Sequence, residues 1–187
     1  MTKHFDFTET PLDGLYVIRR QKIGDSRGFL SRFFCADEFR SIGLTKQVVQ
    51  INHTLTKKKG SVRGMHYQNP PYTEIKIVSC IKGEILDVAV DIRSGSSTFL
   101  QWHSEVLSAD NQASLYIPEG FAHGFQALSD DCELIYLHTE FYEKSSEGAL
   151  NARDPVLLID WSLPISEISD RDRSHPEINN NFKGIQI

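Results

Sequence analysis

The sequence predicts an all-β (mainly β) fold, a sandwich or barrel with a few short helices. Short β-rich runs bounded by turn residues recur along the chain, whereas segments with a helical period are scarce. The chain has 187 residues and 40% hydrophobic content, which is enough for one substantial core and too little for two comfortable domains. We therefore expect a single domain over residues 1–187, with a C-terminal tail from about residue 165 wrapped over its body.

Seven segments of the sequence are predicted to form strands. They are rich in β-branched, aromatic and other apolar residues, and Gly, Pro, Asn, Asp or Ser separates them. The longest run contains Lys82-Gly83, where glycine can adopt a positive φ, and we predict a hairpin there. Its second half alternates between a purely apolar set and a set with Asp87 and Asp91, as expected of a barrel lumen that holds a ligand site. The runs are residues 15–23, 46–56, 75–93, 97–108, 113–119, 121–129 and 132–142.

One short helix is predicted over residues 35–44. Asp37 and Glu38 would lie in its first turn, where acidic side chains favour the helix N-terminus, and Gly43 offers a C-cap. From residue 150 onward the chain is punctuated by Pro and Asn and has no strong period, which is typical of irregular structure.

Composition narrows the class of partner. Lys and Arg number 20 against 25 Asp and Glu, a net charge of −5, and a nucleic-acid surface needs an excess of basic residues. Cys35, Cys80 and Cys132 are widely separated and odd in number, so neither a disulfide framework nor a thiolate zinc site is indicated. The N-terminal residues do not resemble a signal peptide, and no apolar run reaches transmembrane length. We expect a cytoplasmic protein with no nucleic-acid partner and no membrane partner.

The stretch VRGMHYQ, residues 62–68, places one histidine in a predicted strand. Alternation would put His66 and Gln68 on one face and turn Arg63 to the other. Gly64 would leave room for a ligand to approach. His66 could be a reactive base, a metal ligand or a hydrogen-bonded structural histidine. For a lone histidine the structural role is the commonest. The residues that accompany His66 therefore decide which of these roles it has.

The segment PEGFAH, residues 118–123, has the P-x-G-x-x-H spacing of the second cupin motif, a turn that delivers His123 into a barrel lumen. A metal-binding cupin carries two histidines and a glutamate in its first motif, and these ligands suit a divalent transition metal. Here Gln68 stands where the second of those histidines would be. Glu74 is a candidate carboxylate ligand, but its spacing is irregular, so we expect no metal at this site.

Without a metal, a lumen that carries His66, His123, Lys76 and Tyr136 would be a site for acid–base chemistry. Tyr136 could face inward on its strand, although ordinary packing is the simpler role for a strand tyrosine. Lys76 is more informative, because an amine on an apolar strand is either an exposed edge charge or the cation of a site.

Three blocks occur in order between about Gly14 and Pro176, namely RGMHYQNPPYTEIKIVSCIKGEILDVAVDIR, LYIPEGFAHGFQALSD and IDWSLPISEISDRDRSHP. Together they closely resemble the dTDP-4-dehydrorhamnose 3,5-epimerase family. The resemblance implies a cupin jelly-roll fold and an isomerase that needs no cofactor. Such an enzyme takes a dTDP-linked 4-keto-6-deoxy sugar and inverts the carbons on either side of the ketone.

The resemblance also implies catalytic roles. His66 matches the general base, and Asp172 resembles the carboxylate that fixes its tautomer and stabilises the imidazolium. Lys76 matches the cation near the ketone oxygen, where it favours the enolate. Tyr136 matches the acid that returns a proton on the opposite face.

Six further residues fall on positions that the family uses to bind substrate. Arginines suit a diphosphate or sugar because their guanidinium groups form paired hydrogen bonds. Surface salt bridges for the arginines and a turn hydrogen bond for Asn52 are the alternatives. The six are Arg27, Gln50, Asn52, Arg63, His123 and Glu147.

Two departures from the family pattern leave the activity open in detail. Arg32 stands where the family often has a glutamate near the nucleotide, and Glu74-Ile75 replaces the Gln-Gly that often precedes the lysine. We expect 3,5-epimerisation of dTDP-4-dehydro-6-deoxy-D-glucose to dTDP-4-dehydro-L-rhamnose by a homodimer in which N-terminal strands are exchanged or cover the partner. A C3-only epimerase on a related dTDP sugar is the first alternative, and a metal-binding or non-catalytic cupin is the second.

Overall fold

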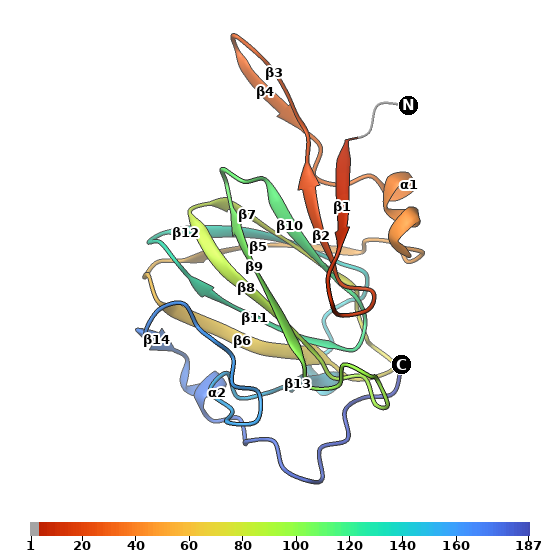
Figure 1. The fold of residues 1–187 in the computed structure, drawn as a ribbon, viewed down its shortest axis with the longest axis vertical. Helices are drawn as coiled ribbons and strands as arrows, with labels where there is room; N and C mark the ends of the chain where they lie inside the picture. Colours follow the sequence, from red (N-terminus) through yellow and green to blue (C-terminus); the bar gives the residue numbers. More distant parts are fainter. Residues whose placement is uncertain (1–3) are drawn as a thin grey trace.

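Two mainly antiparallel sheets face each other in the computed structural model, which describes residues 4–187 (Figure 1). The first sheet has the strand order β1-β2-β10-β7-β12-β5, and the second has the order β13-β6-β11-β8-β9 with β14 beside β6. Helical segments are short. The prediction of an all-β fold with few helices is therefore confirmed.

The strands of the first sheet are β1 (Phe5–Glu9), β2 (Tyr16–Arg20), β10 (Ala113–Ile117), β7 (Lys76–Lys82), β12 (Cys132–His138) and β5 (Gln50–Thr56). Those of the second are β13 (Glu147–Ala149), β6 (Ser61–Gln68), β11 (Phe121–Ala127), β8 (Glu84–Asp91), β9 (Trp102–Ser108) and β14 (Glu167–Ile168). A separate hairpin pairs β3 (Lys22–Asp25) with β4 (Gly28–Ser31). The helical segments are α1 (Ala36–Phe39), η1 (Arg40–Ile42), η2 (Lys144–Ser146) and α2 (Asp170–Arg173).

The main core lies between the two sheets. On β8, Ile85 and Ala89 are fully buried there, whereas Val88 and Val90 pack on the other face of the same strand. That outer face is covered by residues from the C-terminal part of the chain, including Leu157. Asp87 and Asp91 are completely buried among the inward residues, so the mixed inner face predicted for residues 84–92 is present.

The predicted hairpin at Lys82-Gly83 is wrong. Gly83 does form a tight turn with φ of +76°, but β7 pairs with β10 and β12 while β8 pairs with β9 and β11. The turn therefore carries the chain from one sheet to the other. A glycine turn fixes a change of direction and does not specify which strands share hydrogen bonds.

The short helix expected over residues 35–44 is confirmed. It consists of α1 followed by η1, with Asp37 and Glu38 in the first turn and Gly43 as a left-handed C-cap at φ +90°. Phe39 is fully buried, where its ring meets Phe5 edge-on.

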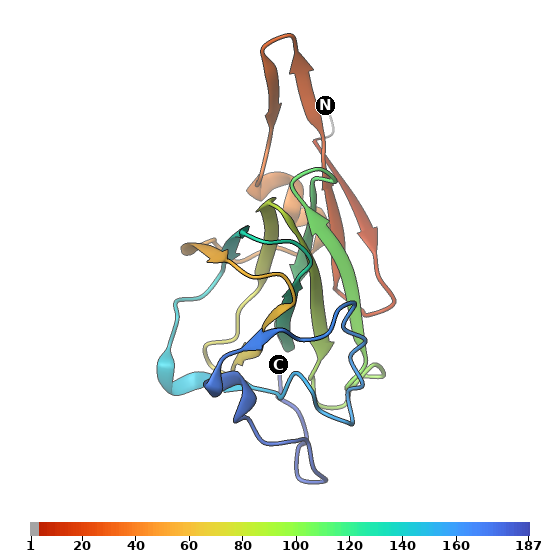
Figure 2. The same cartoon turned by 90° about the vertical axis from the view of Figure 1, so that its left-hand side faces the viewer.

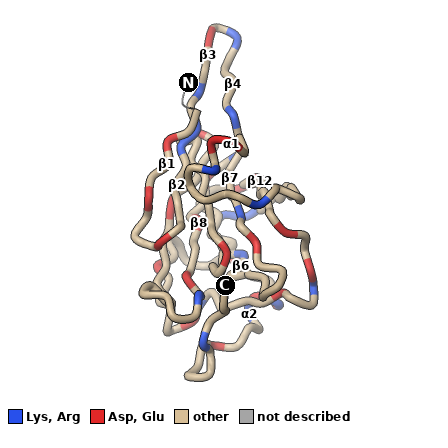
Figure 3. Tube along the Cα trace, turned by 90° about the vertical axis from the view of Figure 1, so that its right-hand side faces the viewer, with Lys and Arg blue, Asp and Glu red and all other residues tan. Residues whose placement is uncertain are grey.

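The hairpin β3–β4 projects away from the body, as Figures 1 and 2 both show. Its apolar side chains are exposed, with Phe29 at 59% and Leu30 at 66%. Basic and acidic residues are both spread along the chain, the hairpin included (Figure 3). Within residues 4–187, no helix is long and apolar enough to cross a membrane.

Candidate active site

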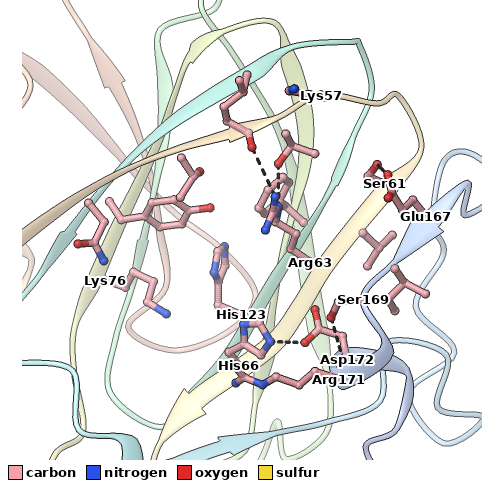
Figure 4. A pocket seen from close by; sticks show the side chains of 18 of the residues that line it. Lys57, Ser61, Arg63, His66, Lys76, His123, Glu167, Ser169, Arg171 and Asp172 are labelled. Carbon is pink, nitrogen blue, oxygen red and sulfur yellow. Dashed lines mark hydrogen bonds and ion pairs between the residues drawn. The ribbon is translucent and has the colours of Figure 1, made fainter.

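A cavity of about 690 Å³ lies between the two sheets, and a second cavity of about 460 Å³ adjoins it. Four residues line both: Asn52, His66, Lys76 and His138. Figure 4 shows the larger cavity, with the side chains of His66, His123 and Lys76 directed into a common space. All four predicted catalytic residues line this cavity.

His66 and Asp172 form a dyad at one side of the larger cavity. His66 Nε2 lies 2.7 Å from Asp172 Oδ1, and the backbone N–H of Gly64 donates to Asp172 Oδ2 at 3.2 Å. Burial acts to raise the pKa of Asp172, but the hydrogen bond and charge of His66 and the bond from Gly64 lower it overall. The carboxylate is thus the acceptor, so Nε2 carries the proton and Nδ1 keeps a free lone pair.

The start of α2 brings Asp172 to His66. Ser169 is the N-cap of this single helical turn, and its hydroxyl oxygen accepts the backbone N–H of Asp172 at 3.0 Å. Asp172 is 106 residues from His66 in the sequence, so the C-terminal segment must fold onto the strand to complete the dyad.

A bulge on β6 places Arg63 and His66 in the same cavity. Phe125 on β11 is opposite Arg63 and His123 is opposite His66, so three steps on β6 match two on β11. The predicted separation of Arg63 and His66 onto opposite faces is therefore wrong for this cavity, since both residues line it.

Gly64 allows two strands to pack closely and does not, as predicted, leave room for a ligand. A Cβ atom built on it would lie 2.5 Å from Gly124 Cα and 2.7 Å from His123 O. The space beside Gly64 is occupied by the backbone of β11 and not by a ligand. Its φ of +126° is also one that favours glycine.

Lys76 belongs to a buried charge network that spacing alone did not reveal. Its Nζ lies 3.3 Å from Glu74 Oε1, and the other carboxylate oxygen of Glu74 lies 2.6 Å from His138 Nδ1. His138 Nε2 in turn lies 3.3 Å from the amide nitrogen of Asn52. Burial acts to raise the pKa of Glu74, but Lys76 and His138 outweigh it and lower the pKa to about 2. The Lys76 side chain is therefore buried and paired with Glu74, and it is not an exposed charge at the edge of a sheet.

Tyr136 enters the cavity from the sheet opposite His66. Burial and the nearby Asp87 carboxylate raise the pKa of Tyr136, so the phenol keeps its proton at neutral pH. The His123 ring lies edge-on to Tyr136 at 6.1 Å and hydrogen-bonds to Asp87 Oδ1 at 2.7 Å. Burial lowers the pKa of His123, although Asp87 acts in the opposite direction.

Five of the six predicted substrate-binding residues lie at the cavities. Arg63 and His123 line the larger one, Gln50 and Glu147 line the smaller one, and Asn52 lines both. Arg27 does not join them. It lies between β3 and β4 with a side chain 87% exposed, paired with Asp25 at 2.6 Å.

No metal-ligand set assembles from the residues that the cupin spacing suggested. The Gln68 amide donates to the carbonyls of Tyr72 and Phe141, and Glu74 is held by Lys76 and His138. The Gln68 side-chain oxygen accepts the backbone N–H of Glu143, and both carboxylate oxygens of Glu74 are engaged, so neither side chain offers a free ligand atom.

The family model for dTDP-4-dehydrorhamnose 3,5-epimerase matches residues 9–180. The chain belongs to this family. An epimerase of this name from Shigella flexneri is 41% identical over 165 residues, which are 88% of this chain and 91% of that one.

Solved structures of epimerases are also similar to this chain. The Legionella pneumophila epimerase in complex with dTDP-4-keto-L-rhamnose is 37% identical with a TM-score of 0.91, covering 98% of this chain and 100% of that one. A 3'-monoepimerase from Streptomyces bikiniensis in complex with dTDP-quinovose is also similar, at 31% identity and a TM-score of 0.82, covering 90% and 85%.

The two departures from the family pattern have structural partners in this member. Arg32, at the position where a glutamate is common, pairs with Glu38 at 3.1 Å, so its charge is balanced within the chain. Glu74, which replaces a glutamine, is matched by His138 on the neighbouring strand. His138 is opposite Lys76 in the sheet register.

Sequence reasoning missed two further polar residues, Arg171 and Tyr142. Arg171 lines the larger cavity and pairs with Glu147, and the Tyr142 hydroxyl donates to the same carboxylate at 3.2 Å. Arg171 lies next to Asp172 in the SDRD block, a position that could have singled it out.

Proposed function

We propose that this protein catalyses the 3,5-epimerisation of dTDP-4-dehydro-6-deoxy-D-glucose to dTDP-4-dehydro-L-rhamnose. The observation that carries the proposal is the cavity in which a His–Asp dyad from one side meets Lys76 and Tyr136 from the opposite sheet. Membership of the epimerase family supports the same reaction.

His66 acts as the base in this scheme. The free Nδ1 lone pair accepts a proton from the carbon next to the ketone, and the electrons of that C–H bond move onto the ketone oxygen as an enolate forms. Asp172 stabilises the resulting imidazolium because its lowered pKa keeps it ionised.

Lys76 and Tyr136 complete the inversion. Lys76, held by Glu74, places a positive charge where the enolate oxygen develops. Tyr136 returns a proton to the carbon from the other sheet, on the face opposite His66. No cofactor is required, since a proton next to a carbonyl is acidic enough for a side-chain base once the enolate is stabilised.

The smaller cavity accommodates the nucleotide part of the substrate. Gln50, Asn52 and Glu147 offer polar groups there, and Arg63 and Arg171 lie at the larger cavity next to it. Guanidinium groups suit a diphosphate. Glu147 pairs with Arg171 in the free chain, so we expect Glu147 to orient Arg171 toward the phosphates.

A second copy of the chain completes the site in this proposal. Arg27 lies outside the cavity of its own chain, on a hairpin with exposed apolar side chains. Strand β5 lies at the end of the first sheet, and no strand among residues 4–187 pairs with its outer edge; Ile51 on this strand is 66% exposed. We propose a homodimer in which the hairpin of one chain covers this edge and offers Arg27 to the partner's nucleotide.

Cys35, Cys80 and Cys132 are all free thiols, which supports a cytoplasmic location for this enzyme.

The experiment that tests this function is an NMR time course with dTDP-4-dehydro-6-deoxy-D-glucose in deuterated water. We expect deuterium at both C3 and C5 of the sugar, together with an L-configured product. Label at C3 alone would assign the chain to the C3-only reaction, which its similarity to a 3'-monoepimerase keeps as the second candidate. Absence of label at both carbons would refute both reactions.

A further inference from the structure

His175 lies beside the His66–Asp172 dyad and has no role in the reaction scheme. Its Nε2 is 4.0 Å from Asp172 Oδ1, the same oxygen that accepts from His66. This Nε2 atom is buried and has no hydrogen-bond partner among residues 4–187. The backbone here is fixed, because Asn151 Nδ2 donates to the carbonyl of His175 at 3.0 Å.

The side chains of His66, Asp172 and His175 lie close enough together to hold a metal ion. One ligand atom each from His66, Asp172 and His175 lies within 4.8 Å of the others. Ligands at the usual zinc distances of about 2.0–2.2 Å and tetrahedral angles are roughly 3.3 Å apart. The 2.7 Å and 4.0 Å separations around Asp172 Oδ1 bracket that value, so small side-chain rotations suffice.

The chemistry of the set favours a first-row transition-metal ion, and we take Zn²⁺ because it has no redox chemistry of its own. Two imidazoles and one carboxylate suit Zn²⁺ better than they suit Mg²⁺ or Ca²⁺, which prefer all-oxygen sites. The three residues are also different from the Gln68 and Glu74 that cupin spacing suggested.

We propose that Zn²⁺ binds to His66, Asp172 and His175 and thereby switches off the base. The metal takes the lone pair of His66 Nε2, and the proton that Nε2 carried moves to Nδ1. No proton is gained or lost by the neutral ring. Nδ1, now an N–H donor, cannot accept a proton from the sugar. Zinc would therefore inhibit the reaction.

The inhibitory part of this proposal rests on the proposed function, but the binding part does not. Zinc binding is therefore measured first by equilibrium dialysis of the metal-free protein, with no substrate present. We expect one zinc per chain in the micromolar range of free metal. His175→Asn should weaken binding by about tenfold or more, because loss of a supporting partner alone costs metal sites roughly 10–100-fold. His175→Gln provides a second variant if the first does not fold.

His103→Asn is the matched control. His103 has the same 22% side-chain exposure as His175, a buried Nε2 without a partner, and a carboxylate 3.9 Å away at Glu105. It belongs to no three-ligand group among the described residues. The control variant should bind zinc as the unaltered protein does.

Activity is the second readout. The metal-free enzyme should be active, added zinc should abolish turnover, and His175→Asn should turn over normally and resist zinc. The proposal is overturned if no stoichiometric zinc binds, if His175→Asn binds it as tightly as the unaltered protein, or if the zinc-loaded enzyme is fully active. If zinc binds as expected but the metal-free enzyme never epimerises the sugar, the proposed function fails and the zinc site stands.

Discussion

At the scale of single residues, the proposed reaction depends most on Nδ1 of His66, the atom that we propose as the base. His66→Ala removes it, and we expect kcat to fall by about 10²–10⁴-fold, which is the usual contribution of a positioned base. Binding of dTDP should persist, because the polar groups that we expect to hold the nucleotide, Gln50, Asn52 and Arg171, remain in this variant. A steady-state assay and calorimetric titration with dTDP test this pair of outcomes. Activity within tenfold of the unaltered enzyme would remove His66 from the role of base.

The ionised carboxylate of Glu74, which pairs with Lys76, contributes to the free energy of unfolding. Its pKa falls from 4.5 to about 2 in the folded protein, so the folded state favours the ionised carboxylate. This contribution is fully present above about pH 4.5 and disappears as the pH falls towards 2. Glu74→Gln should therefore lower the urea midpoint at pH 7, and the difference from the unaltered protein should shrink as the pH approaches 3. An equal difference at both pH values would contradict the assigned network.

At the scale of elements, the contact between β6 and β11 fixes the site. Gly64→Ala would place a Cβ atom against the backbone of Gly124 and His123. We expect a loss of about 1–3 kcal/mol or more in the free energy of unfolding, together with a lower kcat. Gly43→Ala is the control, since its φ is also positive at +90° but nothing lies within 4 Å. Equal losses in the two variants would show that backbone conformation alone matters at Gly64.

Much of the fold was predictable because strand patterns and turn residues are local signals. The helix before Gly43 and the mixed inner face around Asp87 were both predicted correctly. Strand pairing was not, because the turn at Gly83 is equally compatible with a hairpin and with a crossing between sheets. The bulge at Gly64 escaped prediction for a similar reason, since an extra residue is defined only relative to the partner strand.

The residues of the site, like the fold, were predictable only where local sequence signals define them. The family resemblance implied that His66, Lys76 and Tyr136 share one site, and all three line the cavity. The Glu74–His138 pair was missed because its members are 64 residues apart and the local pattern around either one does not indicate the other. The position of Arg27 on a projecting hairpin depends on where that hairpin goes, which the local pattern does not contain.

At the scale of the whole molecule, the projecting hairpin predicts assembly. Light scattering should give twice the chain mass, and Arg27→Ala should raise KM for the dTDP sugar while leaving the dimer intact. Leu30→Asp, which puts a charge on the exposed apolar face, should weaken the dimer. A monomeric enzyme with full activity would refute the shared site.

The central claim is that base and acid act from opposite sheets, and Tyr136→Phe tests it most directly. In deuterated water this variant keeps His66, so the account predicts continued exchange of the sugar protons next to the ketone with little inverted product. His66→Ala in the same assay should lose both. If exchange and inversion in Tyr136→Phe fall together by the same factor, Tyr136 is not the acid on the opposite face and the account is contradicted.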